Sequence, residues 1–353
     1  MSDPKDESRY RTPAHRIGAV RQALDAMRGS RRAILTTHLN ADGDGTGCQV
    51  ALAAWMHALG GRPRIINPTT FPEMYRFLLP DPSWVVEAGS SQAEDLCAEA
   101  DLAVVVDTGE VPRIGRVKPM ISGIRTVVID HHQPGEQPIG GISLRDAEAC
   151  ATGELIFDVL LAGNGPWPKA ALDGMYVAIL TDTGSFRFSN STPGAHRVAA
   201  DLIAAGVDPE AMHARVYGAA PLRRLKLLAK ALGTLEVDEA AGVAWMTVPT
   251  ELDGIEPAPD EAEGLVDYPR SVAGVEVGLL FRRSANGGTK ISFRASGAVD
   301  VNALAREFGG GGHIKASGAL VEKPPAEVIP RVVEATRRAI RAMRDSPREK
   351  AKP

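Results

Sequence analysis

Three short apolar runs, rich in β-branched residues, each end abruptly at a histidine or an aspartate, and this pattern constrains the fold most. The runs are Ala33–Thr37 before His38, Leu102–Val106 before Asp107 and Thr126–Ile129 before Asp130. A polar, glycine-rich turn and a helical pattern over Thr46–Leu59 follow the first run. Repeated strand–loop–helix units predict an α/β domain with a mainly parallel sheet flanked by helices. Ligands of such sheets bind beyond the carboxyl ends of the strands, where these polar residues stand.

The remainder of the chain predicts a smaller α/β domain after a helical connector. Strands are expected at Gly242–Val248, Val275–Phe281 and Thr289–Ala295, and a last amphipathic helix around Ala326–Met343. We expect a catalytic domain over 14–192, a connector over 193–235, a second domain over 236–345, and tails at 1–13 and 346–353.

Composition and charge are those of an ordinary globular protein. The 353 residues suffice for two domains, and the formal net charge is only −4. Binding to long duplex DNA depends on neutralising many phosphates, so this charge argues against such a partner but allows a short anionic ligand. The three cysteines, Cys48, Cys97 and Cys150, form no CxxC pair. The amino terminus lacks a signal-peptide pattern, and no apolar run reaches the roughly 20 residues that span a bilayer. We expect a soluble, cytoplasmic protein without a membrane partner.

Four acidic or histidine-containing clusters stand at the ends of predicted elements. They are His38, Asn40, Asp42 and Asp44 in HLNADGDG, Asp107 in VVVDTGE, Asp130, His131 and His132 in VVIDHHQPG, and Asp182 in ILTDTGSF. One aspartate after a strand is usually a turn former or a helix cap. An EF-hand is excluded because the twelfth position from Asp42 is Ala53 rather than glutamate. Four clusters together indicate a metal site, and carboxylates and imidazoles without thiolate suit Mn²⁺ or a related divalent ion.

In order, HLNADGDGTG, a strand-terminal aspartate, DHH and TDTGSF resemble the signature motifs of the DHH phosphoesterases over Ala14–Ser191. The segment SFRASGAVDVNALAREFGGGGHIKASGA resembles the DHH-associated nucleotide-binding domain. One departure is Ala41, where the family commonly has proline. The resemblance implies an active site in the cleft between the two domains.

The resemblance also implies two bound metal ions, Mn²⁺ with Mg²⁺ or Co²⁺ as substitutes. The implied ligands of one ion are His38, Asp42 and Asp107, and those of the other are Asp44, Asp107, His131 and Asp182. Asp130 would orient a histidine, and His132 would face the substrate phosphate. Two ions about 3.5–4 Å apart activate a shared water, so a bridging hydroxide would be the nucleophile.

Substrate-binding residues are expected in the second domain. Alternation along the strand at Thr289–Ala295 puts Ser292 and Arg294 on one polar face, and the matching residues of the family face the nucleotide. The run Gly310, Gly311 and Gly312 before His313 could bring backbone N–H groups close to an anion. We expect His313 and Arg294 to grip phosphate or base, with His313 also counted among the catalytic residues. Arg187 is a weaker candidate for a phosphate contact.

The subgroup most similar to this sequence is that of the bifunctional oligoribonucleases, which degrade short RNA (nanoRNA) and remove the 3′-phosphate from 3′-phosphoadenosine 5′-phosphate (pAp). A cyclic di-AMP or pApA phosphodiesterase of the same family is the nearest alternative. A RecJ-type exonuclease is disfavoured because the chain lacks room for an added oligonucleotide-binding domain, and a family II pyrophosphatase lacks the GGGGH pattern. An alternative of another class is a non-catalytic nucleotide-binding protein. The oligomeric state stays open, with a homodimer as one alternative.

Overall fold

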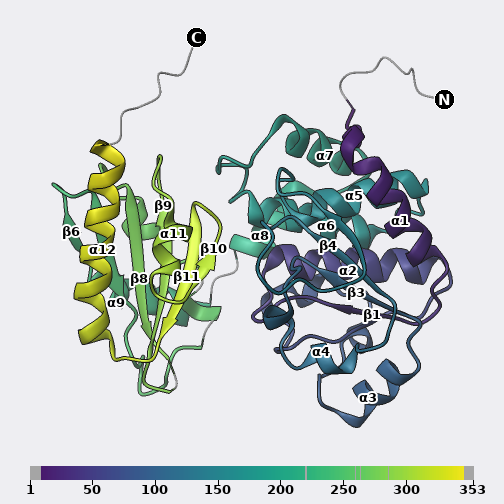
Figure 1. The fold of residues 1–353 in the computed structure, drawn as a ribbon, viewed down its shortest axis with the longest axis horizontal. Coiled ribbons are helices and arrows are strands. Elements are labelled where there is room, and N and C mark those ends of the chain that lie inside the picture. Colours follow the sequence, from purple (N-terminus) through teal and green to yellow (C-terminus); the bar gives the residue numbers. More distant parts are fainter. Residues whose placement is uncertain (1–8, 219–220, 259, 263, 285, 346–353) are drawn as a thin grey trace. The chain divides into compact units, whose positions relative to one another are not determined.

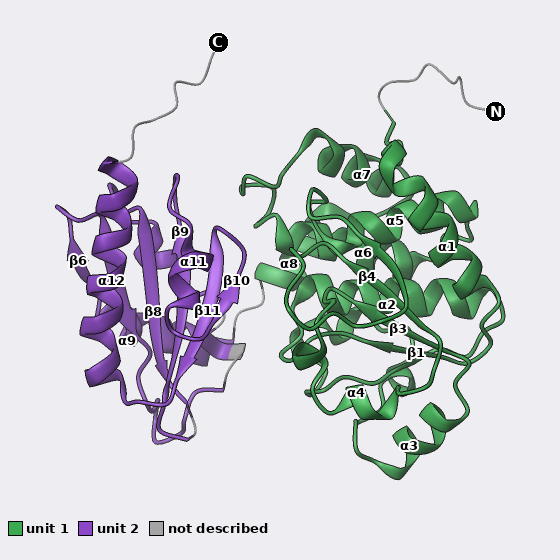
Figure 2. Ribbon diagram, in the orientation of Figure 1, with its two compact units in different colours: residues 1–219 green, residues 220–353 purple. Residues whose placement is uncertain are grey.

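The chain divides into two compact units, residues 1–219 and 220–353 (Figure 2). The computed structural model describes residues 9–218, 221–258, 260–262, 264–284 and 286–345. Within these residues, no helix is both long enough and apolar enough to cross a membrane.

The first unit contains a parallel five-stranded sheet in the order β2-β1-β3-β4-β5 (Figure 1). Its strands are β1 (Ala33–Thr36), β2 (Arg64–Ile65), β3 (Leu102–Val106), β4 (Thr126–Asp130) and β5 (Ile142–Arg145). Its α-helices are α1 (Ile17–Arg28), α2 (Gly43–Ala58), α3 (Ser91–Ala98), α4 (Val117–Met120), α5 (Thr152–Gly163), α6 (Lys169–Asp182), α7 (Pro193–Ala204) and α8 (Pro209–Tyr217). Short 3₁₀ turns lie at Ala14–Arg16, Glu73–Leu78, Pro82–Trp84 and Val111–Ile114.

Helices cover both faces of this sheet, which explains why its strands are apolar at nearly every position. Leu35, Val104 and Val106 pack on one face against helices that include α1, α2, α5 and α6. Ile34 and Val105 point to the other face, where α3 and α4 lie (Figure 1). The predicted α/β class with a mainly parallel sheet is confirmed.

The second unit is built on a mixed six-stranded sheet in the order β10-β11-β9-β8-β7-β6, in which only the β7–β8 pair is parallel. Its strands are β6 (Glu236–Asp238), β7 (Val243–Thr247), β8 (Val277–Arg283), β9 (Thr289–Ala295), β10 (Gly311–Gly312) and β11 (Ala316–Val321). Its helices are α9 (Leu222–Leu232), α10 (Asp267–Arg270), α11 (Val301–Arg306) and α12 (Pro325–Asp345), with a 3₁₀ turn at Asp260–Ala262. α11 and α12 pack on one face and α9 on the other.

Element boundaries differ from the sequence expectation where a side chain caps an end. The helix expected at Thr46 begins at Gly43, because the Asp42 carboxylate accepts hydrogen bonds from the N–H groups of Asp44 and Gly45. Residues 193–235 are largely helical, with α7 and α8 in the first unit and α9 in the second.

Candidate metal centre

The acids and histidines predicted from the sequence converge at the carboxyl edge of the parallel sheet. His38, Asp107 and Asp130 come from the ends of the adjacent strands β1, β3 and β4. Parallel strands end at the same edge, so side chains distant in sequence meet there. Asp44, in the first turn of α2, and Asp182, at the end of α6, join them: each lies within 4 Å of His131 Nε2.

Asp44 is fixed by the amino terminus of α5. Its Oδ2 accepts a hydrogen bond from the N–H of Thr152 at 2.7 Å, and its Oδ1 accepts one from the N–H of Gly153 at 3.0 Å. The thiol of Cys48 also donates to Oδ1 at 3.1 Å. A helix amino terminus stabilises a carboxylate, so this buried acid is held in one orientation.

Asp107 is the central residue of the cluster because its two oxygens face different histidines. Oδ2 lies 3.2 Å from His38 Nε2, and Oδ1 lies 3.7 Å from His131 Nε2. The Oγ1 of Thr152 donates a hydrogen bond to Oδ1 at 3.0 Å. Asp107 has a φ of 58°, in the left-handed region that non-glycine residues seldom adopt. Such backbone strain is typical of functional sites.

Asp107 belongs to both groups of potential ligands that contain the predicted metal-binding residues, and a third group joins it to Asp130 and His132. His38, Asp42 and Asp107 form one group, and Asp44, Asp107 and His131 form the other, with the ligand atoms of each group within 4.8 Å of one another. Asp182 Oδ2 lies 3.5 Å from His131 Nε2. The six residues predicted as metal ligands are thus brought together within the first unit.

The electrostatics of this cluster fit a bound cation. Burial raises the pKa of the Asp44 carboxyl well above its ordinary value, and the nearby Asp107 and Asp182 raise it further. Burial by itself would lower the pKa of His38, but Asp42 and Asp107 outweigh it and raise that pKa to about 10. Crowded, buried carboxylates are costly unless positive charge compensates them.

The chemistry of the ligand atoms indicates which class of cation the cluster could bind. The cluster offers carboxylate oxygens and imidazole nitrogens, a set that suits Mn²⁺ or another divalent ion. The thiol of Cys48 lies beside Asp44 of the cluster. Burial and the charge of Asp44 raise the pKa of this thiol well above its ordinary value. It stays protonated and donates to Asp44 instead of acting as a thiolate ligand. The residues present therefore fit divalent metal binding.

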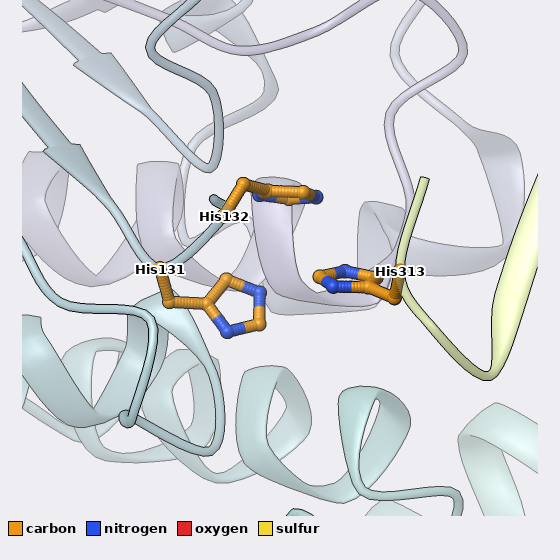
Figure 3. A group of neighbouring side chains, drawn as sticks. All are labelled: His131, His132 and His313. Atoms are coloured by element: carbon orange, nitrogen blue, oxygen red, sulfur yellow. The ribbon is translucent and has the colours of Figure 1, made fainter. Parts of the chain in front are cut away.

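Asp130 holds His132, and the two lie next to Asp107: His132 Nδ1 is 3.6 Å from Asp107 Oδ1. Its Oδ1 accepts hydrogen bonds from the His132 backbone N–H at 3.0 Å and from Nδ1 at 2.8 Å. The rings of His131 and His132 are nearly perpendicular, with centroids 4.9 Å apart (Figure 3). Figure 3 also labels His313, which belongs to the second unit.

The predicted substrate residues of the second unit lie on β9 and around β10. Ser292 and Arg294 are on the less buried face of β9, while Ile291 and Phe293 are in the core. The glycine amides are engaged within the unit: Gly310 N–H donates to the carbonyl of Ala305 and Gly312 N–H to Oδ1 of Asn302. His313 N–H donates to the carbonyl of Ala316.

The glycines also let β10 approach β11. A Cβ on Gly310 would lie 2.1 Å from the carbonyl oxygen of Gly318, and Gly312 has a φ of 148°. In the first unit, Arg187 is exposed and its Nε donates to the carbonyl of Gly184.

Sequence reasoning missed Thr152 and Asn190, which hold predicted ligands, and Arg145, which lies beside the Asp130 of the DHH motif. Asn190 Nδ2 donates to the carbonyls of Cys150 and Asp182, at 2.8 and 3.2 Å. Arg145 lies beside Asp130, with Nε 3.3 Å from Oδ2. Thr152 is the first residue of α5, and its partner Asp44 is 108 residues away in the sequence, so no local pattern marked the contact.

Comparison with known proteins identifies both units. Residues 32–179 match the DHH family, N-terminal domain, and residues 243–342 match the DHHA1 domain. The chain is 30% identical to the bifunctional oligoribonuclease and PAP phosphatase NrnA of Thermus thermophilus, over 90% of this chain and 92% of that protein. It is 28% identical to the protein of the same name from Bacillus subtilis, over 82% of this chain and 88% of that protein.

Solved structures share the fold. An exopolyphosphatase-related protein from Bacteroides fragilis superposes with a TM-score of 0.84 at 23% identity, covering 93% of this chain and 98% of that chain. RecJ from Thermus thermophilus, in complex with Mn²⁺, has a TM-score of 0.52 at 16% identity, covering 96% of this chain and 56% of that chain.

Proposed function

The chain belongs to the DHH family of phosphoesterases, as its motifs predicted, and from that premise we propose that it hydrolyses short oligoribonucleotides and pAp. Oligoribonucleotides would be cleaved to mononucleotides, and pAp to AMP and phosphate. Two relatives that span most of the chain bear names that combine oligoribonuclease and PAP phosphatase activity. The proposal treats both substrates as ligands of one site, because each presents a phosphate ester on a small nucleotide.

The observation that carries the proposal is the position of Asp107 between two groups of ligands. One of its oxygens faces His38 and the other faces His131. This arrangement supports two divalent ions per chain, with Mn²⁺ as the proposed metal. His38, Asp42 and Asp107 would hold one ion, and Asp44, Asp107, His131 and Asp182 the other.

When bound, a pair of divalent ions makes water a stronger nucleophile at neutral pH and stabilises charge on the oxygens around phosphorus. The protein's own part is orientation. The amino terminus of α5 holds Asp44 in place through two backbone N–H groups, and Asp130 holds the ring of His132 through Nδ1. We assign His132 the role of contacting the phosphate that is cleaved.

Substrate binding is assigned in part to the second unit. Arg294 and His313 would contact phosphate or base, and Ser292 would contact the nucleotide from the same face of β9. The loop of Gly310, Gly311 and Gly312 would contact the nucleotide and set the position of His313, and the amides of Gly310 and Gly312 are held within the unit. Arg187 would make a further phosphate contact.

The test offers the purified protein, with Mn²⁺, equal concentrations of a diribonucleotide, pAp and cyclic di-AMP, and separates the products by chromatography. Turnover of the first two, with cyclic di-AMP intact, is the expected result. Opening of cyclic di-AMP at a comparable or greater rate would assign the protein to cyclic-dinucleotide turnover. No turnover of any substrate, with nucleotide binding retained, would point to a non-catalytic role. Asp130→Ala/His131→Ala is the inactive control.

A further inference from the structure

Arg145 is a partly buried cation beside the DHH motif whose role the proposed function does not explain. It is the last residue of β5 and pairs in register with Asp130, the last residue of β4. Its Nε lies 3.3 Å from Oδ2 of Asp130. The Asp130 side chain is only 1% exposed and the Arg145 side chain 17%. A carboxylate so deeply buried requires a compensating partner.

The backbone of the first unit leaves space for the Arg145 guanidinium. A Cβ on Gly109 would lie 1.1 Å from Nη2 of Arg145 and 2.3 Å from Cζ. The φ of Gly109 is not positive, so its backbone conformation is open to any residue. Glycine is needed here because a side chain would occupy the space of the guanidinium. Any larger residue there would push the guanidinium away from its place.

A second carboxylate lies near the guanidinium. Glu110 Oε1 is 4.0 Å from Nη2 of Arg145. The Glu110 carboxylate also accepts hydrogen bonds from the N–H groups of Gly135 and Gln137, at 3.0 and 2.9 Å. Arg145 therefore lies within 4 Å of both the carboxylate of the DHH motif and one that fixes the loop following that motif.

The remaining oxygen of Asp130 connects this arrangement to His132. Oδ1 is 2.8 Å from Nδ1 of His132. The same oxygen accepts a hydrogen bond from the His132 backbone N–H at 3.0 Å, so Oδ1 acts as the acceptor and the facing Nδ1 would carry the proton, which fixes the ring in one tautomer. Arg145 is thus paired with Asp130 by charge, since its Nε and Oδ2 of Asp130 are 3.3 Å apart without forming a hydrogen bond, and Asp130 in turn holds His132 by a hydrogen bond.

We propose that Arg145 is a positioning residue that acts through Asp130 to set the orientation and tautomer of His132. The proposal rests on the proposed function for the role of His132 and on the contacts above for the position of Arg145. It assigns Arg145 neither a metal nor a substrate. The guanidinium faces the two carboxylates of Asp130 and Glu110, so loss of Arg145 should lower kcat and leave KM and Mn²⁺ affinity nearly unchanged.

The experiment compares Arg145→Gln, Arg145→Lys and Gly109→Ala with Arg125→Gln, which removes an exposed arginine at the other end of β4. We expect Arg145→Gln to lower kcat by about 10- to 100-fold, as loss of residues that orient an active-site histidine does. Arg145→Lys keeps the positive charge, so its kcat should fall less than that of Arg145→Gln. Gly109→Ala should resemble Arg145→Gln, because the new methyl group displaces the flexible end of the arginine.

Coupling between the two positions is a stricter test. If Gly109→Ala acts only by displacing Arg145, the double variant will be no slower than Arg145→Gln alone. Mn²⁺ affinity, measured by calorimetry, should stay within about 3-fold of the wild type in all variants, since no proposed ligand changes. A rise in KM with unchanged kcat would overturn the proposal and make Arg145 a substrate contact.

A measurement independent of turnover separates this inference from the proposed function. The Mg²⁺-loaded protein, labelled with ¹⁵N in its eight histidines, reports the tautomer of each ring by NMR, and His132→Gln identifies the His132 signal. The Nδ1-protonated form of His132 should be present in the wild type and in Arg125→Gln, and lost in Arg145→Gln. An unchanged His132 signal in Arg145→Gln would overturn the inference even if the enzyme were active. Loss of the Nδ1-protonated form of His132 in Arg145→Gln would support the inference even if neither the diribonucleotide nor pAp were cleaved.

Discussion

Gly47 of α2 and Gly174 of α6 lie in direct backbone contact within the first unit. A Cβ on Gly47 would lie 2.3 Å from the carbonyl oxygen of Gly174, and a Cβ on Gly174 would lie 2.5 Å from the carbonyl oxygen of Gly47. The two helices that meet here begin and end at proposed metal ligands: Asp42 caps α2, and Asp182 ends α6. The glycine contact therefore sets the distance between parts of the site.

Gly174→Ala should destabilise the protein because the contacted atoms belong to backbone that cannot move without separating two helices. Overpacking of this kind typically costs about 1–3 kcal/mol of the free energy of unfolding. Gly18→Ala is the matched control, since a Cβ at that position in α1 meets nothing within 4 Å. It should leave stability unchanged or raise it by up to about 1 kcal/mol. Urea unfolding followed by circular dichroism would measure both, and equal stability of the two variants would contradict the packing argument.

Asp107→Asn should abolish binding of both metal ions, because both groups of ligands use this carboxylate. Wild-type protein should be stabilised by Mn²⁺, by about 2.7 kcal/mol at 100 times the dissociation constant. The variant should show no such stabilisation, and its activity should fall by at least about 100-fold, more than loss of an outer partner costs. Thermal unfolding with and without Mn²⁺ tests the first effect. Retention of half the bound Mn²⁺ would mean that the two groups do not share Asp107.

Strands β1, β3 and β4 could be predicted from sequence because each is apolar and is followed at once by a polar residue. The same signal placed the proposed ligands at one edge of the sheet. Strands β2 and β10, of two residues each, carried no such pattern. Pairing with neighbouring strands defines them, and a short sequence does not reveal its partner.

The residues that hold the ligands were harder to predict than the ligands. Thr152 and Asn190 are ordinary polar residues near the ends of helices, and their partners come from other elements. The glycines before His313 illustrate a different difficulty. Their sequence suggested amides open to an anion, but the amides of Gly310 and Gly312 bond within the second unit. A glycine run has the same appearance whether it serves a ligand or close packing of strands.

Metal binding should release protons. The state of His38 in the metal-free protein shows why protons are released rather than taken up. Its pKa is raised to about 10 by nearby carboxylates, so at neutral pH the metal-free protein holds it as an imidazolium. The pKa of His131 is also raised, by Asp182 and Asp107 against the effect of burial. A metal ligand must be a neutral imidazole, so Mn²⁺ competes with these protons and binds more weakly as pH falls.

Calorimetric titration with Mn²⁺ in buffers of different ionisation enthalpy measures the number of protons released. At about pH 7 we expect more than one, and His38→Gln should reduce the number by about one. In the metal-free protein, the stability that His38 contributes is fully present below its ordinary pKa of about 6.5 and is lost as pH rises through about 10. Mn²⁺ should therefore stabilise the protein more at alkaline pH. A binding heat that does not depend on the buffer would contradict this view of the site.

Thr152 offers a test of how the protein orients its central carboxylate. Its hydroxyl donates to Oδ1 of Asp107 at 3.0 Å, while its backbone N–H donates to Oδ2 of Asp44 at 2.7 Å. Thr152→Val removes the first hydrogen bond, keeps the second and preserves the shape of the side chain. Partners that orient metal ligands typically contribute about 10- to 100-fold in metal affinity, so Mn²⁺ binding by Thr152→Val should weaken by at least about 10-fold.

Thr152→Ser restores the hydroxyl but lacks the methyl group, so it should bind Mn²⁺ nearly as well as the wild type. Calorimetric titration of both variants separates the two contributions of the side chain. Weakening in the Ser variant alone would show that packing of the methyl group matters and that the hydrogen bond does not. Weakening in Val alone would mean that the start of α5 fixes Asp44 by its backbone and Asp107 by a side chain.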